Sequence, residues 1–519
     1  MLQSHLTPKR RRLATLWSVL TNRLPFCLSG KWRRAWGQSP FSCALPYPPL
    51  ATPDAALLPP FVTDSPVAMH YWRLLGALDW QHFPERNPQR AWPGVEPQSR
   101  APYAAAFLVK LDQGLPHMRD LRTYLVAHPP LVWLLGFALT DSTRYAWGFD
   151  ADGSLPCQRQ FSRVLRTLPN AALQFLLDGT VHLLQQESPP DLRFGDEIAL
   201  DTKHIIAWVK ENNPNRHAPH RCDKTVQPKG DPDCKLGCKE RTNQRRGAAA
   251  QPDASASPPP ASPPPASPKT PTTNPLPASA VEVGTFYWGY ASGIVTAKLP
   301  GWGEFVLAEY TQPFNVGETT YFFPLMQQVE RRLGFRPRFG ALDAAFDAFY
   351  IYDYFDQAGG FAAVPLVDRG RPTRPFDADG QPLCDAGLVM PMKATFADRS
   401  HLMPHERGRY VCPLLFPVAT GQPCPVAHKK WPEGGCVSTL PISRGTRILN
   451  QLDRTSEQYT RLYAQRTTTE RIFSQAKELG IERPKLRNAH SIANLNTLTY
   501  VLLNLRTWQR CRQQPLTAG

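Results

Sequence analysis

The sequence predicts an α/β protein in which a helical region precedes a mixed sheet flanked by helices. Three observations predict this class. Apolar residues recur every three or four positions through much of 116–190, which is the period of a helix. Strand-like runs at 197–201, 285–310 and 338–343 then alternate with helical stretches. A final apolar helix is predicted at 492–508. Strands that alternate with helices are typical of α/β folds.

The first two regions differ in texture. Residues 1–115 are rich in Pro, Trp and Arg and show little periodicity, so we expect a partly irregular basic arm. Its run Lys9-Arg10-Arg11-Arg12 suits DNA, and a disordered tail is the simpler interpretation. Residues 116–190 form a predicted helical domain that includes Ser162. Its helices either read DNA as a helix-turn-helix or only pack together, because periodicity reports burial and not groove contact.

Residues 195–359 are expected to form the first part of the sheet domain. Its first strand, 197–201, precedes a polar and Pro-rich excursion at 212–280 that we expect to be extended. The elements after the excursion are paired strands within 285–310 with a turn at Pro300-Gly301, a helix ending at Leu333, a strand at 338–343 and a helix at 344–354.

Two regions complete the chain. Residues 360–452 contain short β-prone runs between Pro, Gly and charged turns, which predicts a β-rich insertion. Residues 453–510 return to helices. We expect one continuous helix from about Thr455 to Leu479, followed by the apolar helix at 492–508.

Charge and cysteine usage restrict the partners and the compartment. The 519-residue chain has 59 Lys and Arg against 43 Asp and Glu, a net charge of +16, which favours nucleic acid over a membrane surface as partner. The longest strongly apolar run, 131–139, is too short to cross a bilayer, and no secretory signal is recognised. The eleven irregularly spaced cysteines argue against a disulfide scaffold. We therefore expect an intracellular protein without a membrane partner.

A polar signature lies on the predicted helix near the C-terminus. Its members are Tyr463, Arg466, Glu470 and Lys477. At about 100° per residue these positions fall within an arc of roughly 60° on a continuous helix. A carboxylate flanked by cations, with an aromatic nearby, suits a metal ion that handles a nucleic-acid phosphate. One carboxylate is not a catalytic site, so partners are required upstream.

Two aspartates at the ends of predicted strands supply these partners. Asp201 ends the first strand and Asp343 ends the later one, so neighbouring strands would bring them together and a helix would add Glu470. Three such oxygen ligands suit Mg²⁺ or Mn²⁺, and a pair of these ions promotes phosphoryl displacement. Each residue also has a simpler interpretation as a cap or an i,i+4 ion pair. The acids most able to replace them are Asp196, Asp347 and Asp353.

Together these residues make the chain similar to the DDE transposases of bacterial insertion sequences, in the branch with the Tyr-(2)-Arg-(3)-Glu-(6)-Lys signature. The likeness covers roughly Glu197 to Trp508, and Trp288-Gly289-Tyr290 resembles the strand motif between the aspartates. The resemblance implies an RNase H-like catalytic core in which 360–452 is the insertion. It also implies that Asp201, Asp343 and Glu470 are the catalytic ligands of Mg²⁺ or Mn²⁺.

The resemblance also implies partners. Arg466 and Lys477 are assigned to DNA phosphates near the cut, and Tyr463 to a phosphate or a displaced base. Lys485 and Arg487 extend this phosphate track, or belong to a solvated basic loop. The implied partners are double-stranded DNA at element ends and target, and a second copy of the chain on DNA. The implied location is the bacterial cytoplasm, associated with the nucleoid.

Alternatives remain for the function and for the cysteines. A transposase-derived DNA-binding protein without catalysis, or a non-specific metal-dependent nuclease, would use the same residues. Two sets of residues are candidates for structural zinc, the first with closely spaced thiols and the second with uneven spacing, although ordinary reduced thiols are the preferred interpretation. These sets are His220, Cys222, Cys234 and Cys238, and Cys412, Cys424, His428 and Cys436.

Overall fold

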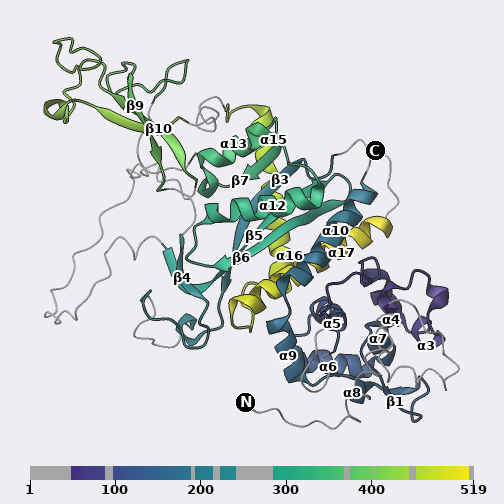
Figure 1. The fold of residues 1–519 in the computed structure, drawn as a ribbon. Coiled ribbons are helices and arrows are strands. Elements are labelled where there is room, and N and C mark those ends of the chain that lie inside the picture. Colours follow the sequence, from purple (N-terminus) through teal and green to yellow (C-terminus); the bar gives the residue numbers. More distant parts are fainter. Residues whose placement is uncertain are drawn as a thin grey trace, which may run out of the picture.

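The computed structural model describes residues 48–87, 98–188, 193–213, 223–240, 284–366, 375–400, 403–442 and 452–513. These residues form a helical N-terminal region, a six-stranded mixed sheet with helices on both faces, and a separate three-stranded sheet (Figure 1). The predicted α/β class is confirmed. The basic run at 9–12 and the Pro-rich tract at 254–277 lie outside the described residues.

The N-terminal region is helical on both sides of residue 115. Its helices are α3 (Pro60–Thr63), α4 (Pro66–Leu75), α5 (Ala101–Asp112), α6 (Met118–Ala127), α7 (Pro129–Leu134), α8 (Ala151–Ser154), α9 (Gln158–Thr167) and α10 (Asn170–Glu187). The described residues before 116 thus contain three α-helices that were not predicted within the partly irregular arm. Helix α5 escaped the sequence pattern because it is buried almost all round, and such a helix has no polar face to reveal its period.

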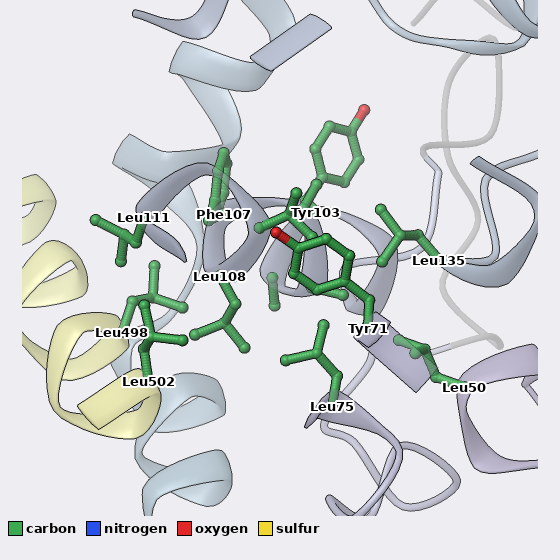
Figure 2. Close-up of a cluster of buried hydrophobic side chains, with 14 of the residues drawn as sticks. Leu50, Tyr71, Leu75, Tyr103, Phe107, Leu108, Leu111, Leu135, Leu498 and Leu502 are labelled. Atoms are coloured by element: carbon green, nitrogen blue, oxygen red, sulfur yellow. The ribbon is translucent and has the colours of Figure 1, made fainter. Parts of the chain in front are cut away.

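One apolar core holds this helical region to the rest of the chain. Figure 2 shows Phe107 and Leu108 of α5 beside Leu498 and Leu502, which come from the C-terminal helix α17 (Ala489–Gln513). Helix α17 also contacts α9, α10 and strand β6. The helical region is thus fixed to the sheet domain through α17, a contact between segments nearly 400 residues apart.

The central sheet has the order β4-β5-β3-β7-β8, and β6 pairs with β5. Its strands are β3 (Glu197–Ile206), β4 (Lys235–Glu240), β5 (Gly284–Leu299), β6 (Gly303–Pro313), β7 (Phe339–Leu342) and β8 (Phe361–Ala363). Strands β3, β7 and β8 are parallel, whereas the pairings of β5 with β3, β4 and β6 are antiparallel. Strand β5 is long enough to pair with β4 along its first half and with β6 along its second.

The sheet differs from the prediction in three ways. Strand β3 continues to Ile206, so Asp201 lies in the middle of the strand and not at its end. Strand β8 belongs to the central sheet, so the insertion begins after Ala363 and not at 360. Strand β4 lies within the polar excursion and was not predicted, because its pairing with β5 is a long-range contact that local sequence does not encode.

The two faces of the sheet are covered by different helices. Leu200 and Val295 pack with α12 (Phe322–Leu333) and α13 (Phe349–Gln357) in one core. Ile294 packs with α16 (Thr467–Glu478) and α17 in the other. Asp201 is aligned with Ile294, and residues directly opposite each other on paired strands share a face. Asp201 therefore lies on the face that α16 covers.

The insertion is β-rich, as predicted. Strands β9 (Met392–Asp398), β10 (His405–Val411) and β11 (Val437–Pro441) form an antiparallel sheet in the order β11-β10-β9. Figure 1 shows this sheet on the opposite side of the central sheet from the N-terminal helices. Across the described residues, none of the helices has the length and apolar character needed to cross a membrane.

Candidate active site

The two predicted aspartates lie side by side on the central sheet. Leu200 of β3 is aligned with Leu342 of the parallel strand β7, and each aspartate is the next residue along its strand. Asp343 also caps a short 3₁₀ turn, since its side chain accepts a hydrogen bond from the backbone N–H of Ala345 at 2.9 Å. The cap interpretation of Asp343 and its place beside Asp201 are thus both correct.

The helix that carries the signature is broken at Arg466. Helix α15 (Glu457–Ala464) ends before it and α16 begins after it, so the predicted continuous helix is wrong. The backbone N–H of Arg466 bonds to the carbonyl of Tyr463 at 3.0 Å, which is an i to i−3 bond. The hydroxyl of Thr469 donates to the Arg466 carbonyl at 2.7 Å. Side-chain bonds of this kind compete with the helical ladder, and here they accompany a tightened turn.

This turn places Arg466 between two of the predicted carboxylates. Its Nη1 donates to Oδ2 of Asp201 at 3.3 Å, and its Nη2 donates to Oε1 of Glu470 at 2.6 Å. Glu470 is therefore one guanidinium away from the aspartates. The i,i+4 ion pair of Arg466 with Glu470 is real, and it is part of the acidic cluster and not a separate surface feature.

Burial and mutual repulsion disfavour full ionisation of this cluster. Burial, with repulsion from Asp343, raises the pKa of Asp201 from 3.8 to about 7. Burial also raises the pKa of Asp343, against a hydrogen bond from Ala345 and attraction to Arg466. Burial lowers the pKa of Arg466, but Asp201 and Glu470 outweigh it and raise that pKa overall. A site with this excess of negative charge favours a cation.

Tyr463 lies at the edge of the same cluster. Burial raises the pKa of its hydroxyl, and attraction to Arg466 lowers it. Asp343, Asp201 and Glu470 each raise the pKa of Tyr463 further. Its ring stacks on that of Tyr459, with centroids 5.9 Å apart, so the ring direction is fixed within α15. The charges of all three acids therefore act on the tyrosine that was predicted from sequence.

A fourth carboxylate was missed by the sequence analysis. Glu318 begins a 3₁₀ turn (Glu318–Tyr321) and its Oε1 accepts a hydrogen bond from the Thr202 hydroxyl at 2.9 Å. Its charge contributes to the raised pKa of Asp201, after burial and Asp343. His204 Nε2 lies 3.9 Å from the same carboxylate. No local pattern marks Glu318, because only the packing of its turn against β3 brings it near.

Lys477 does not reach the acidic cluster. Its Nζ lies 3.3 Å from Oε2 of Glu482, and Nζ of Lys203 lies 3.4 Å from the same oxygen. The backbone N–H of Ile206 donates to the Glu482 carbonyl at 2.9 Å, which fixes the loop after α16 to the end of β3. Glu482 therefore holds two lysines together, one from β3 and one from α16. Both lysines come after the carboxylates of their own elements, Asp201 and Glu470, in the sequence.

The loop after α16 separates the two other predicted DNA contacts. Lys485 and Arg483 are exposed and line a groove of about 1480 Å³ between this loop and helices α5, α6 and α9. Arg487 points elsewhere, because its guanidinium lies 4.8 Å from the centroid of the half-exposed Trp208 ring. The predicted track from Lys485 to Arg487 is therefore divided between two surfaces.

Helix α9 gives this groove a second basic wall. Arg159, Arg163 and Arg166 are exposed at helical spacing, and all three line the groove. Phe161 and Leu165 on the opposite side are buried in the helical core. None of the three arginines forms an ion pair with any residue that the structure describes. The sequence periodicity predicted this helix. The structure shows in addition that its three arginines line the groove.

The alternative acids have structural roles. Asp196 forms an ion pair with Arg338, whose Nη2 is 2.5 Å from Oδ2, and is placed at the start of β3. Asp347 accepts a hydrogen bond from the Tyr352 hydroxyl at 2.8 Å. Asp353 accepts one from Gln357 within the same helix. None of them replaces Asp201 or Asp343.

The described residues contain no group of three or more His, Cys, Asp or Glu side chains that is already arranged to hold a metal ion. Asp201 and Asp343 nevertheless fit a divalent cation, because they are adjacent hard oxygen donors with raised pKa values. Glu470, about half exposed, joins them only if its bond with Arg466 opens.

The two cysteine sets differ in their surroundings. His220 and Cys222 lie outside the described residues. Cys234 is buried and its thiol donates to the Asp231 carbonyl, whereas Cys238 is exposed. The second set lies in the insertion, where buried thiols do gather.

Comparison with known proteins gives no family for the chain. No protein-family model, no curated protein and no solved structure matches it. Its functional assignment therefore depends on its own residues and their geometry.

Proposed function

We propose that this chain is a DDE-type DNA transposase of the bacterial insertion-sequence class. The observation that carries the proposal is the alignment of Asp201 and Asp343 on parallel strands, with Glu470 linked to Asp201 through Arg466. Two carboxylates from different strands lie side by side, and a third from a distant helix is joined to one of them through Arg466. A stabilising ion pair on a protein surface needs no such gathering of like charges, which costs stability.

The strand order supports an RNase H-like core. Three antiparallel strands, β6, β5 and β3, are followed across the sheet by β7 and β8, which are parallel to β3. The first aspartate is on the central strand β3 and the second follows the neighbouring strand β7. The insertion then separates β8 from the helices α15 and α16, which return to the same face with Glu470.

The proposed chemistry divides between a metal and the protein. Asp201, Asp343 and Glu470 would hold Mg²⁺ or Mn²⁺, which when bound activates a water or 3′-hydroxyl and stabilises the leaving oxygen. Asp201 must first lose its proton, and its raised pKa makes this the step that depends on pH. With Glu470 bound to a metal, the Arg466 guanidinium would be available to bind a DNA phosphate through two hydrogen bonds.

The proposed DNA path connects two basic surfaces. Lys203 and Lys477 are held by Glu482 beyond the carboxylates, and the loop that holds Glu482 continues to Arg483 and Lys485 in the groove. Helix α9 faces the same groove with its free arginines. We infer that the duplex next to the cleaved end binds in this groove. Element ends, target DNA, a dimer on DNA and a nucleoid-associated location in the bacterial cytoplasm are all parts of this proposal.

The decisive experiment is a strand-transfer assay. Purified full-length protein is incubated with Mg²⁺, a plasmid and labelled DNA carrying the inverted repeats that flank the coding region. Joining of the labelled 3′-end to the plasmid is the expected result. Hydrolysis without joining would replace the proposal with a nuclease. Binding without cutting in either Mg²⁺ or Mn²⁺ would replace it with a DNA-binding protein that has lost catalysis.

A further inference from the structure

The insertion has an unusual core. Among the described residues of 375–442, the buried cluster consists of Cys384, Met390, Cys412 and Cys436, so three of its four members are cysteines. Five partly buried side chains pack against it: Ala386, Tyr410, Leu414, Leu415 and Trp431. Strand β9 is exposed along nearly its whole length and contributes no buried side chain. A module of this size rarely obtains enough stability from so few apolar groups, and small modules of this kind are usually held by disulfides or a metal ion.

The sheet register brings two of the thiols together. Val411 of β10 is paired with Val437 of β11, so Cys412 follows one strand as Cys436 precedes the other. Gly435 has a φ of 81°, and a Cβ at this position would lie 2.7 Å from Cβ and 3.2 Å from Sγ of Cys412. The backbone before Cys436 thus passes directly over Cys412. Both thiols belong to the same buried cluster.

A tight turn supplies the third thiol. The backbone N–H of Gly387 donates to the carbonyl of Cys384 at 2.9 Å, and Gly387 has a φ of 74°. The chain therefore reverses immediately after Cys384, whose side chain is buried against the other two cysteines. Such turns present a sulfur atom at the tip of a loop.

A fourth ligand is available from the turn at Cys424–His428. The backbone N–H of Ala427 donates to the carbonyl of Cys424 at 3.1 Å, and Ala427 has a φ of 44°. Nε2 of His428 lies 3.7 Å from the carboxylate of Asp385, the residue next to Cys384. This turn is therefore positioned against the thiol cluster and carries two residues of zinc-binding type.

We propose that Cys384, Cys412 and Cys436, with one ligand from the turn at Cys424–His428, bind a structural Zn²⁺ that holds the insertion together. Three thiolates and one further N or S ligand match tetrahedral zinc. A disulfide could join only two of the three thiols and would leave the third buried beside it. The described side chains do not already converge on one point. Binding therefore requires rotation of the thiols within the cluster and release of their protons.

The zinc content of the full-length protein tests this directly. After purification without chelators, mass spectrometry of the metals should find about one zinc per chain, from the four-ligand stoichiometry. Cys384→Ser, Cys412→Ser and Cys436→Ser should each lose most of it. Cys157→Ser, an exposed cysteine before α9, is the matched control and should keep it. Absence of zinc from the wild-type chain overturns the proposal, as does a Cys412–Cys436 disulfide in non-reducing peptide mass spectrometry.

A second measurement remains informative if the serine variants fail to fold. X-ray absorption at the zinc edge of the wild-type protein should show at least three sulfur ligands at about 2.3 Å. A shell of oxygen ligands alone overturns the proposal. Asp201→Asn should retain the zinc, so failure of the proposed catalytic site and failure of the zinc site are distinguishable.

Two further variants assign the fourth ligand. Cys424→Ser or His428→Gln should lower the zinc content or speed its removal by a chromogenic chelator, and only one of the two should do so. An unchanged content and removal rate in both variants would overturn the assignment of a ligand to this turn. Spacing along the chain indicated Cys412, Cys424, His428 and Cys436 but not Cys384, because β9 and β10 separate Cys384 from the others.

Discussion

Asp201 and Asp343 are neighbours because the Leu200–Leu342 pair precedes them in two parallel strands. The strands place both acids at the same level of the sheet. Because both side chains are buried, water does not solvate their charges well. This explains why Asp343 is the second largest cause of the raised pKa of Asp201, after burial. A cation that binds both carboxylates relieves the burial cost and the repulsion together.

The first prediction concerns these two acids. Asp201→Asn or Asp343→Asn should lower Mg²⁺-dependent cleavage of element-end DNA by more than about 100-fold, since even outer-shell substitutions at metal sites cost 10- to 100-fold. The measurement is single-turnover cleavage of a labelled duplex. Asp353→Asn is the matched control, because Asp353 is partly exposed and its hydrogen bond with Gln357 lies within its own helix. Wild-type cleavage by Asp343→Asn would exclude the proposed site.

The second prediction follows from the raised pKa of Asp201. A carboxyl with a pKa of 3.8 in the unfolded chain and about 7 in the folded chain binds more protons when folded. Its contribution to the free energy of unfolding is therefore greatest below pH 3.8 and is lost as the pH rises to about 7. Asp201→Asn removes this loss. With a chelator present to remove metal ions, the melting temperature of Asp201→Asn minus that of wild type should increase from pH 5 to 7. Above pH 7 this difference should be constant.

The control for this experiment is Asp353→Asn, whose melting temperature should follow that of wild type across the same range. A difference between wild type and Asp201→Asn that is constant with pH would show that Asp201 is not protonated near neutrality. Adding Mn²⁺ at pH 8 should raise the melting temperature of wild type and not that of Asp201→Asn, because the ion binds the ionised carboxylates.

Local sequence was sufficient for the strands and helices that carry the acids. The strand predicted at 338–343 and the helix predicted to end at Leu333 correspond to β7 and α12. Helix α12 is buried on one face, which gives a clear helical period, and β7 is a short apolar run that is buried at three consecutive residues. Apolar periodicity did not reveal α5, because this helix is buried on all sides. It also placed the end of β3 too early, because the strand continues past Asp201.

The remaining features depend on long-range packing. Glu318 approaches Asp201 because its turn bonds to Thr202 of β3, a contact over 116 positions of sequence. The break at Arg466 contains neither Gly nor Pro, and it is marked by the hydroxyl of Thr469 bonding to the backbone. The basic face of α9 becomes a groove wall only because the loop after α16 lies opposite it.

The third prediction separates metal binding from catalysis at Arg466. Its guanidinium occupies oxygens of Asp201 and Glu470 that a metal would use. At pH 8.5, above the pKa of Asp201, Arg466→Gln should bind Mn²⁺ in the absence of DNA about 3- to 10-fold more tightly, since a nearby positive charge is worth about 1 kcal/mol in a partly exposed site. Cleavage of DNA by the same variant should fall, because the phosphate loses its bidentate partner.

The control for Arg466 is Arg461→Gln. Arg461 is an exposed arginine of α15, and its ion pair with Glu197, at 3.0 Å, lies outside the acidic cluster. Its loss should change neither Mn²⁺ affinity nor cleavage appreciably. Weaker Mn²⁺ binding by Arg466→Gln would mean that Arg466 organises the carboxylates and does not compete for them. Both affinities are measured by electron paramagnetic resonance of free Mn²⁺.

The fourth prediction concerns the groove between α9 and the loop after α16. Arg159 and Arg163 are exposed and free of acidic partners among the described residues, so each is available for a phosphate. Each phosphate contact contributes about 0.9 to the slope of log affinity against log salt. Arg159→Gln with Arg163→Gln should therefore reduce that slope by about 1.8 and weaken binding of element-end duplex.

Arg331→Gln with Arg336→Gln provides a control with the same change in net charge. These arginines are paired with Asp178 and Glu330, at 3.3 and 3.4 Å, and do not line the groove. Fluorescence anisotropy over a range of salt concentrations should give this double variant the wild-type slope. Equal loss of slope in both double variants would show that DNA responds only to net charge. A loss confined to the α9 variant identifies the groove as the surface that the duplex occupies.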